Sequence, residues 1–154
     1  MGSRGYDAVM GLLLRSTTRG HRLLHRVTRG RWGRTLVGAP IVWLTLPGRR
    51  TGEPRTVPLL VSRDLGHDPV AWVVCGSNAG QTAVPAWVHN ARAAGSGVVL
   101  DGGTRVPVRV VEVLDPDEHD RLYAGMVEVW RGFRAYRVAA GRHVPLFRLV
   151  PMTP

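Results

Sequence analysis

Short apolar stretches separated by glycine- and proline-rich turns make up most of the chain after residue 40. Their lengths are typical of β-strands, and turn signals such as Pro47-Gly48 and Gly66-His67-Asp68-Pro69 stand between them. The expected strands are 41–46, 55–62, 70–75, 98–100, 104–114 and 144–150. Connections this short favour antiparallel neighbours. Pro58 has no amide hydrogen, so we expect the second strand to have an edge or a bulge at that position.

Two segments between these strands have the pattern of helices. Residues 85–94 predict a short helix that ends at Gly95. A second helix is expected to begin at 115–118, where acidic side chains suit the positive end of the helix dipole. Its apolar stripe, expected to face the core, comprises Leu122, Met126, Val129, Trp130 and Phe133. Because no strand–helix–strand unit repeats, the pattern favours a mainly antiparallel α+β fold in which the sheet closes into a barrel.

The first 35 residues have a different pattern, with eight arginines and a single acid, Asp7. Their apolar and basic positions fall on different faces at helical spacing. We therefore predict a basic amphipathic helical segment over 1–35, followed by a barrel domain over 36–154. Such a segment either packs on the barrel with its arginines in water or associates peripherally with anionic lipid, and both alternatives stay open.

Composition adds that the 154 residues carry a formal net charge of +10, and that all 21 basic residues are arginine. A chain of this length is the size of one domain. The planar guanidinium group binds phosphates and carboxylates through paired hydrogen bonds, so an anionic partner is expected. Charge alone does not choose among a nucleic acid, a membrane surface and an anionic cofactor.

The single cysteine, Cys75, lies in the apolar run 70–75 and is expected to be a buried core thiol without chemistry. One cysteine forms no intrachain disulfide. The sequence shows neither a cleavable secretion signal nor an apolar stretch of the ~18–20 residues that cross a bilayer. We therefore expect a cytoplasmic protein, located at the inner face of the membrane if the N-terminal segment binds lipid.

Common catalytic motifs are missing from the sequence: it has no Walker loop, GxGxxG, HExxH, CxxC or GxSxG. The six histidines are scattered along the chain, and no metal site is expected. The acids at 115–120 are better explained by helix capping than by acid–base catalysis.

The densest group of arginines lies in the turn Gly48-Arg49-Arg50-Thr51-Gly52-Glu53-Pro54-Arg55. A hairpin needs the glycines and the proline but not three neighbouring arginines, because like charges repel unless an anion neutralises them. Composition leaves a merely solvated basic turn as an equal alternative.

A second polar group, Gly76-Ser77-Asn78-Ala79-Gly80, follows a strand and precedes the helix that begins near Pro85. Its glycines let a ligand approach the backbone, and the helix start offers amide groups. An ordinary strand-to-helix connection with Trp87 as a core anchor explains the same residues.

Taken in order, the motifs GRRTGEPR, TVPLL, GSNAG, PAWVHN and RHVPLFRL resemble the deazaflavin-dependent nitroreductase and quinone reductase family. That family shows GRKSGxPR, (V/N)PL, (A/G)SxGG, PxW(Y/V)xN and R(x)IP(L/V) in the same order. The resemblance extends over residues 41–150. It implies a split β-barrel of the flavin-reductase or FMN-binding type, and it implies coenzyme F420, a deazaflavin with a phosphate and a polyglutamate tail.

The resemblance also implies roles for individual residues. The anionic tail is held by Arg49, Arg50, Thr51 and Arg55. Further cofactor contacts come from Thr56 and Pro58. The deazaflavin ring and the acceptor pocket are lined by Ser77, Asn78, Gly80, Pro85, Ala86 and Trp87. The hydride acceptor is faced by Trp130, Phe133 and Tyr136, with Ser77 or Tyr136 donating a hydrogen bond to its oxygen.

The expected reaction is hydride transfer from the reduced deazaflavin to a quinone, nitro or enone acceptor, with the cofactor supplying the chemistry. Some family members carry two tyrosines and a lysine where this chain has Trp130, Phe133 and Asn78, which leaves the acceptor open. An FMN-binding enzyme on the same barrel is one alternative, since the same arginines can hold a flavin phosphate. A non-catalytic basic nucleic-acid-binding barrel is another, but the tryptophans lie on apolar faces rather than in a stacking ladder, and no nucleic-acid partner is expected.

Overall fold

The computed structural model describes residues 35–36 and 38–152. Except for Thr35, the predicted basic segment lies outside the described residues, and with it the choice between packing on the barrel and binding to anionic lipid. No helix in the described part of the chain is both long and apolar enough to cross a bilayer.

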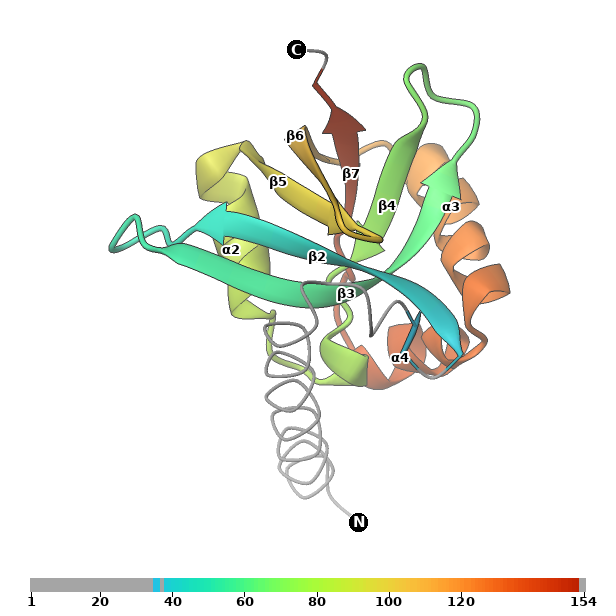
Figure 1. Cartoon of the computed structure of the whole chain (residues 1–154). Coiled ribbons are helices and arrows are strands. Elements are labelled where there is room, and N and C mark those ends of the chain that lie inside the picture. Colours follow the sequence, from blue (N-terminus) through green and yellow to red (C-terminus); the bar gives the residue numbers. More distant parts are fainter. Residues whose placement is uncertain (1–34, 37, 153–154) are drawn as a thin grey trace.

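An antiparallel barrel forms the body of the molecule (Figure 1). Its strands are β2 (Ala39–Pro47), β3 (Pro54–Asp64), β4 (Ala71–Cys75), β5 (Ser96–Asp101), β6 (Thr104–Glu112) and β7 (Leu146–Pro151). They follow one another in the order β2-β3-β4-β7-β6-β5, and pairing of β5 with β2 closes the ring. The short strand β1 (Thr35–Leu36) adds to the edge of β2. The predicted α+β split barrel is confirmed.

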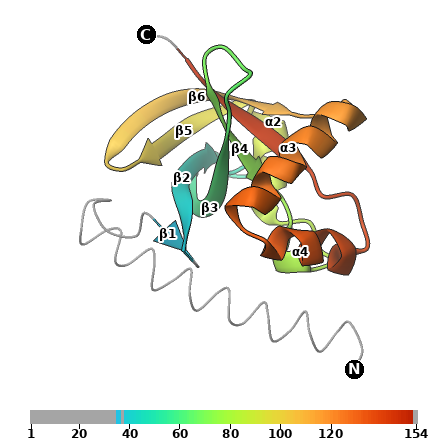
Figure 2. The same ribbon diagram turned by 90° about the vertical axis from the view of Figure 1, so that its right-hand side faces the viewer.

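Helical elements cover the barrel on two sides (Figures 1 and 2). They are the short 3-10 helix η1 (Asn78–Gly80), α2 (Ala86–Ala94), α3 (Pro116–Val129) and α4 (Gly132–Ala140). Helix α2 packs against β2, β5 and β6, whereas α3 packs against β3, β4 and β7. Helix α4 lies beside η1.

Strand β4 separates two apolar cores, because successive side chains of a strand point to opposite faces. Trp72 and Val74 join the core inside the barrel, into which α2 inserts Val88. Val73 and Cys75 face the second core, which lies beneath α3 and α4. All five residues of β4 are therefore buried, as the uninterrupted apolar run indicated.

The sequence was wrong about one continuous helical stripe from Leu122 to Phe133. Helix α3 ends at Val129, and Trp130 has extended backbone angles (φ −152°, ψ 116°) before α4 begins at Gly132. A Cβ atom at Gly132 would overlap the indole ring of Trp130, so glycine makes room for that ring to fold back over the chain. Phe133 is buried, but from the second helix.

Pro58 lies at a local edge, as predicted, but not at a bulge. The pairing of β3 with β2 runs without a skipped residue from Leu60 to Pro54. Strand β4 pairs with β3 only over residues 61–64, so Pro58 has a single partner strand within the described sheet. An edge position leaves the missing amide hydrogen without consequence.

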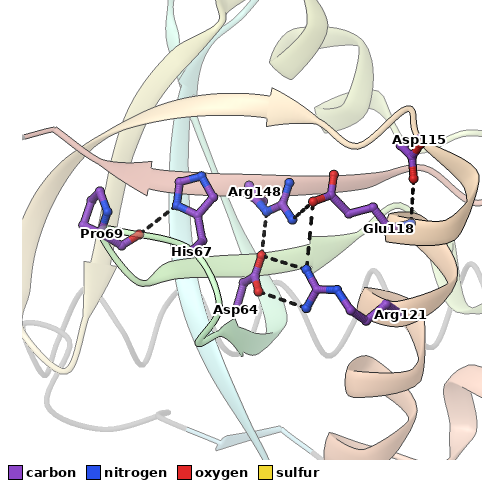
Figure 3. A network of polar contacts seen from close by, with 7 residues as sticks. All are labelled: Asp64, His67, Pro69, Asp115, Glu118, Arg121 and Arg148. Atoms are coloured by element: carbon purple, nitrogen blue, oxygen red, sulfur yellow. Dashed lines mark hydrogen bonds and ion pairs between the residues drawn. The ribbon is translucent and has the colours of Figure 1, made fainter.

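A buried ionic network joins α3 to the barrel (Figure 3). The side chain of Asp64, at the end of β3, is 1% exposed and accepts from Arg148 Nε at 2.7 Å. Arg121 of α3 reaches the same carboxylate, while Arg148 also contacts Glu118. Burial raises the pKa of Asp64, but the hydrogen bonds from Arg121 and Arg148 outweigh it and hold that pKa below its ordinary value. Asp115 caps α3 by accepting from the Glu118 amide, as the sequence indicated.

Candidate functional site

The arginine-rich turn connects β2 to β3 and is closed by its own backbone. The Gly48 amide donates to the Glu53 carbonyl at 2.8 Å, and the Gly52 amide donates to the Gly48 carbonyl at 2.7 Å. Gly52 has φ +70°, a conformation that favours glycine. Thr51 Oγ1 accepts from the Glu53 amide at 3.3 Å. The predicted tail-binding residue Thr51 therefore also stabilises the turn.

All three arginines of this turn, Arg49, Arg50 and Arg55, are exposed. None of them takes part in an ion pair among the described residues. The stem of Arg55 passes close to Gly48, where an added Cβ atom would lie 3.5 Å from Arg55 Cγ. The fold thus concentrates positive charge at one projecting turn, whose single acid, Glu53, forms no ion pair among the described residues.

Asn90 of α2, to which the sequence assigned no role, attaches this turn to the helix. The Arg49 amide donates to Asn90 Oδ1 at 3.2 Å, and Asn90 is buried. The hydroxyl groups of Thr45 on β2 and Thr56 on β3 lie 2.9 Å apart and form a hydrogen bond between these two strands. The turn is consequently held in place from two sides.

The loop over residues 76–83 has an unusual backbone. Asn78 and Ala79 have positive φ values of 49° and 53°, which are uncommon outside glycine and cost stability unless the surroundings enforce them. The Gly76 amide donates to the Pro145 carbonyl at 2.8 Å, and the Gly80 amide donates to the Ser77 carbonyl at 3.0 Å. Strained backbone of this kind often occurs at functional sites.

The two polar side chains predicted to line the site from this loop, Ser77 and Asn78, both bond to other residues of the chain. Ser77 is buried and hydrogen-bonds with the Cys75 thiol, and burial raises the pKa of Cys75 to about 12. Cys75 is therefore protonated at neutral pH, in agreement with the prediction of an inert core thiol. Asn78 Nδ2 donates to the Ala83 carbonyl at 3.1 Å, within the same loop.

The predicted aromatic residues form one cluster on α4 and the turn before it. The ring centroid of Trp130 lies 5.6 Å from that of Phe133 and 5.0 Å from that of Tyr136. Phe133 is buried, whereas Trp130 and Tyr136 are half-buried. Gly80 lies against Tyr136, because an added Cβ atom would be 3.2 Å from Tyr136 Cδ1. The fold therefore brings the loop and the aromatic cluster together.

Helix α2 links this loop to the arginine turn. It follows Pro85, which supplies no side-chain cap to the first amides, and Ala86 at its start is exposed. Trp87 is half-buried and meets Phe147 edge to face at 5.4 Å, so it also anchors α2 on the inner core. Ala86 and Asn90 are one helical turn apart, a rise of about 6 Å. A cationic turn at one end and a polar, aromatic-lined region at the other make an elongated candidate site.

No cluster of three or more potential metal-ligating side chains occurs in the part of the chain that the structure describes. Besides Asn90, sequence reasoning gave no role to Arg142, which lies between α4 and β7 and contacts the backbone of the 76–83 loop. Arg142 belongs to the motif RHVPLFRL, one of those that carried the resemblance. Its contacts with the loop join residues about 60 or more positions apart, which the motif alone does not indicate.

The order of the motifs is matched by a known family. The sequence model of the F420H(2)-dependent quinone reductase family matches residues 17–151, most of the chain. The chain belongs to this family. The resemblance drawn from the motifs is thereby confirmed.

Known proteins support the assignment to the F420H(2)-dependent quinone reductase family. An F420H(2)-dependent quinone reductase of Mycobacterium tuberculosis (strain H37Rv) is 34% identical over 100 residues, covering 63% of this chain and 64% of that protein. The matched region thus spans less than two thirds of the relative's length. A solved F420-H2 dependent reductase superposes with a TM-score of 0.64 at 26% identity, over 76% of this chain and 99% of that one. A structure described as a domain-swapped dimer gives a TM-score of 0.65 at 26% identity, over 85% and 93% of the two chains.

Proposed function

We propose that this protein is an F420-dependent oxidoreductase that transfers a hydride from the reduced deazaflavin to a quinone. The observation that carries the proposal is the exposed arginine turn, which forms no ion pair with a described residue and is joined through Asn90 to the helix that starts beside the polar loop. Membership of the F420H(2)-dependent quinone reductase family supports the choice of cofactor and acceptor.

Arg49, Arg50 and Arg55 would hold the phosphate and carboxylates of the cofactor tail. Guanidinium groups bind both anions through paired, charge-assisted hydrogen bonds. None of the three is neutralised by a described carboxylate, so an incoming anion does not compete with an existing ion pair. Thr51 already accepts a backbone hydrogen bond in the turn and would contribute its hydroxyl hydrogen.

The ring would lie toward the 76–83 loop and the start of α2. Ala86 is small and exposed, and the first amides of α2 have no side-chain cap, which suits close approach by a flat polar group. When bound, the reduced deazaflavin supplies the hydride. The protein residues then orient the ring and exclude water from the reacting face.

The acceptor would stack against the aromatic cluster of α4. Trp130 and Tyr136 are half-buried and present flat apolar surfaces of the kind that a quinone ring packs against. Of the two predicted donors to the acceptor oxygen, Ser77 is buried against Cys75, whereas Tyr136 retains exposed surface. We therefore assign this hydrogen bond to Tyr136.

Anaerobic oxidation of the reduced coenzyme tests the proposal. We expect the purified protein to oxidise reduced F420 when a quinone is added, with slower turnover of nitroaromatic and enone compounds. The absorbance of the oxidised deazaflavin follows the reaction, and an assay without quinone is the control. Turnover with nitroaromatics or enones but not with quinones would overturn the assignment of the acceptor.

A further inference from the structure

Arg142 holds together the two ends of the 76–83 loop. It follows Gly141, the left-handed residue (φ +59°) that ends α4, and precedes β7. Its Nε atom donates to the Thr82 carbonyl at 2.9 Å. Its Nη2 atom lies within hydrogen-bond distance of further carbonyl oxygens, those of Gly76 (3.1 Å), Ser77 (3.4 Å), Gln81 (3.2 Å) and Ala83 (3.1 Å). One side chain therefore contacts the beginning and the end of the loop.

The charge of Arg142 faces neutral carbonyl groups. No carboxylate in the described part of the chain forms an ion pair with it, unlike Arg121, Arg137 and Arg148. Burial lowers the pKa of Arg142, but arginine remains protonated under ordinary conditions. A positive charge is thus held directly behind the loop.

The contacts of Arg142 with the loop carbonyls also fix the direction of the neighbouring amide groups. The peptide bonds of the loop are trans, so each N–H group points opposite to the carbonyl of the same peptide unit. Carbonyls that converge on Arg142 require the amides of the following residues to point away from it. These amides belong to Ser77, Asn78, Thr82, Ala83 and Val84, and that of Ser77 bonds with the buried Cys75 thiol. The strained residues Asn78 and Ala79 lie between the clamped ends.

We propose that Arg142 is a positioning residue, whose guanidinium group holds the 76–83 loop in the shape that receives the deazaflavin ring. The Gly76 amide, which donates to the Pro145 carbonyl, joins the beginning of the loop to the segment before β7, but the other loop bonds, from the Gly80 amide and from Asn78, are too local to hold its end there. The identity of the ligand rests on the proposed function, whereas the clamp itself does not. By orienting the amides of Asn78, Ala83 and Val84 away from its guanidinium group, Arg142 would present them as donors to oxygen atoms of a bound ring.

Hydrogen–deuterium exchange without cofactor tests the clamp independently of the function. In Arg142→Ala we expect exchange of the hydrogen-bonded loop amides, those of Gly80 and Gln81, to accelerate by about tenfold or more, while β4 and β7 keep their protection. Arg137→Ala is the matched control, because Arg137 is an exposed arginine of α4 that pairs with Asp120 rather than with the loop. Unchanged exchange in the loop, or equal acceleration throughout the barrel, would overturn the proposal.

Arg142→Lys provides a second test should the alanine variant fail to fold. Lysine keeps the charge but has a single ammonium group, which does not span carbonyls at both ends of the loop. We expect faster loop exchange than in the wild type; exchange equal to the wild type would contradict the clamp.

The same lysine variant connects the clamp to turnover. We expect kcat to fall by about tenfold while the Kd for F420 changes by less than about threefold, because the tail contacts remain. A larger effect on Kd than on kcat would contradict positioning of the ring. If wild-type protein binds no F420, the proposed function fails, but the exchange result still decides the clamp.

Discussion

Replacing Arg55 by alanine is expected to weaken the binding of coenzyme F420 by about 10- to 100-fold, the effect of losing one charge-assisted contact of ~1.5–3 kcal/mol. Arg55 is exposed, forms no ion pair with a described residue, and has its stem against Gly48 at the base of the turn. Its removal therefore takes away a tail contact without breaking an interaction within the described fold. Titration of the protein with oxidised F420, followed by fluorescence, measures the change.

Arg105→Ala is the matched control for this substitution. Arg105 is also exposed, and it pairs with Leu100 on β5, whose own partner on β2 is Trp43. Arg55 instead faces Leu46, toward the other end of β2. Both substitutions remove one positive charge, so a general loss of electrostatic attraction would affect them alike. Equal affinities of Arg55→Ala and wild type would place the tail site elsewhere.

Replacing Asp64 by asparagine is expected to lower the free energy of unfolding by about 3–5 kcal/mol, as for other buried ion pairs broken on one side. The Asp64 side chain is 1% exposed and the Arg148 side chain 10% exposed, so the remaining guanidinium keeps only Glu118 as a carboxylate partner. Urea unfolding measures the loss. Asp120→Asn, which breaks the exposed pair with Arg137, should cause a much smaller change.

The pH dependence of stability gives the same substitution a second signature. The pKa values of Asp64 and Glu118 are lower in the folded protein than their ordinary values of 3.8 and 4.5. Their contribution to stability is therefore complete above the ordinary values and is lost as the pH falls through the folded values. Asp64→Asn should flatten the acid limb of the stability curve. An acid limb as steep as that of the wild type would show that the network is not its source.

Local signals explain why the barrel and the arginine turn were predictable from sequence. Strand and turn residues act on their immediate neighbours, so Gly48 and Gly52 identify the hairpin, and Gly95 identifies the end of α2. The break between α3 and α4 was missed because Trp130 and Phe133 continue the helical spacing. Only the packing of the indole ring over Gly132 separates the two helices.

Contacts between distant residues explain what sequence reasoning missed in the candidate site. Asn90 meets Arg49 across 41 positions, and Arg142 meets Gly76 across 66. No local spacing encodes such pairs, because they arise only when the barrel closes. Ser77 was expected at the acceptor because its hydroxyl group donates hydrogen bonds, yet the fold buries it against Cys75. The proposed roles of the arginines depend on the exposure of their side chains. That exposure was predictable, because charged residues in a turn lie at the surface.

We propose that the arginine turn belongs to a site for a deazaflavin rather than for FMN. Separate titrations of the purified protein with oxidised F420 and with FMN, each followed by fluorescence under identical ionic conditions, test it most directly. We expect saturable binding of F420 that FMN in excess does not displace. Tight binding of FMN without binding of F420 would contradict it.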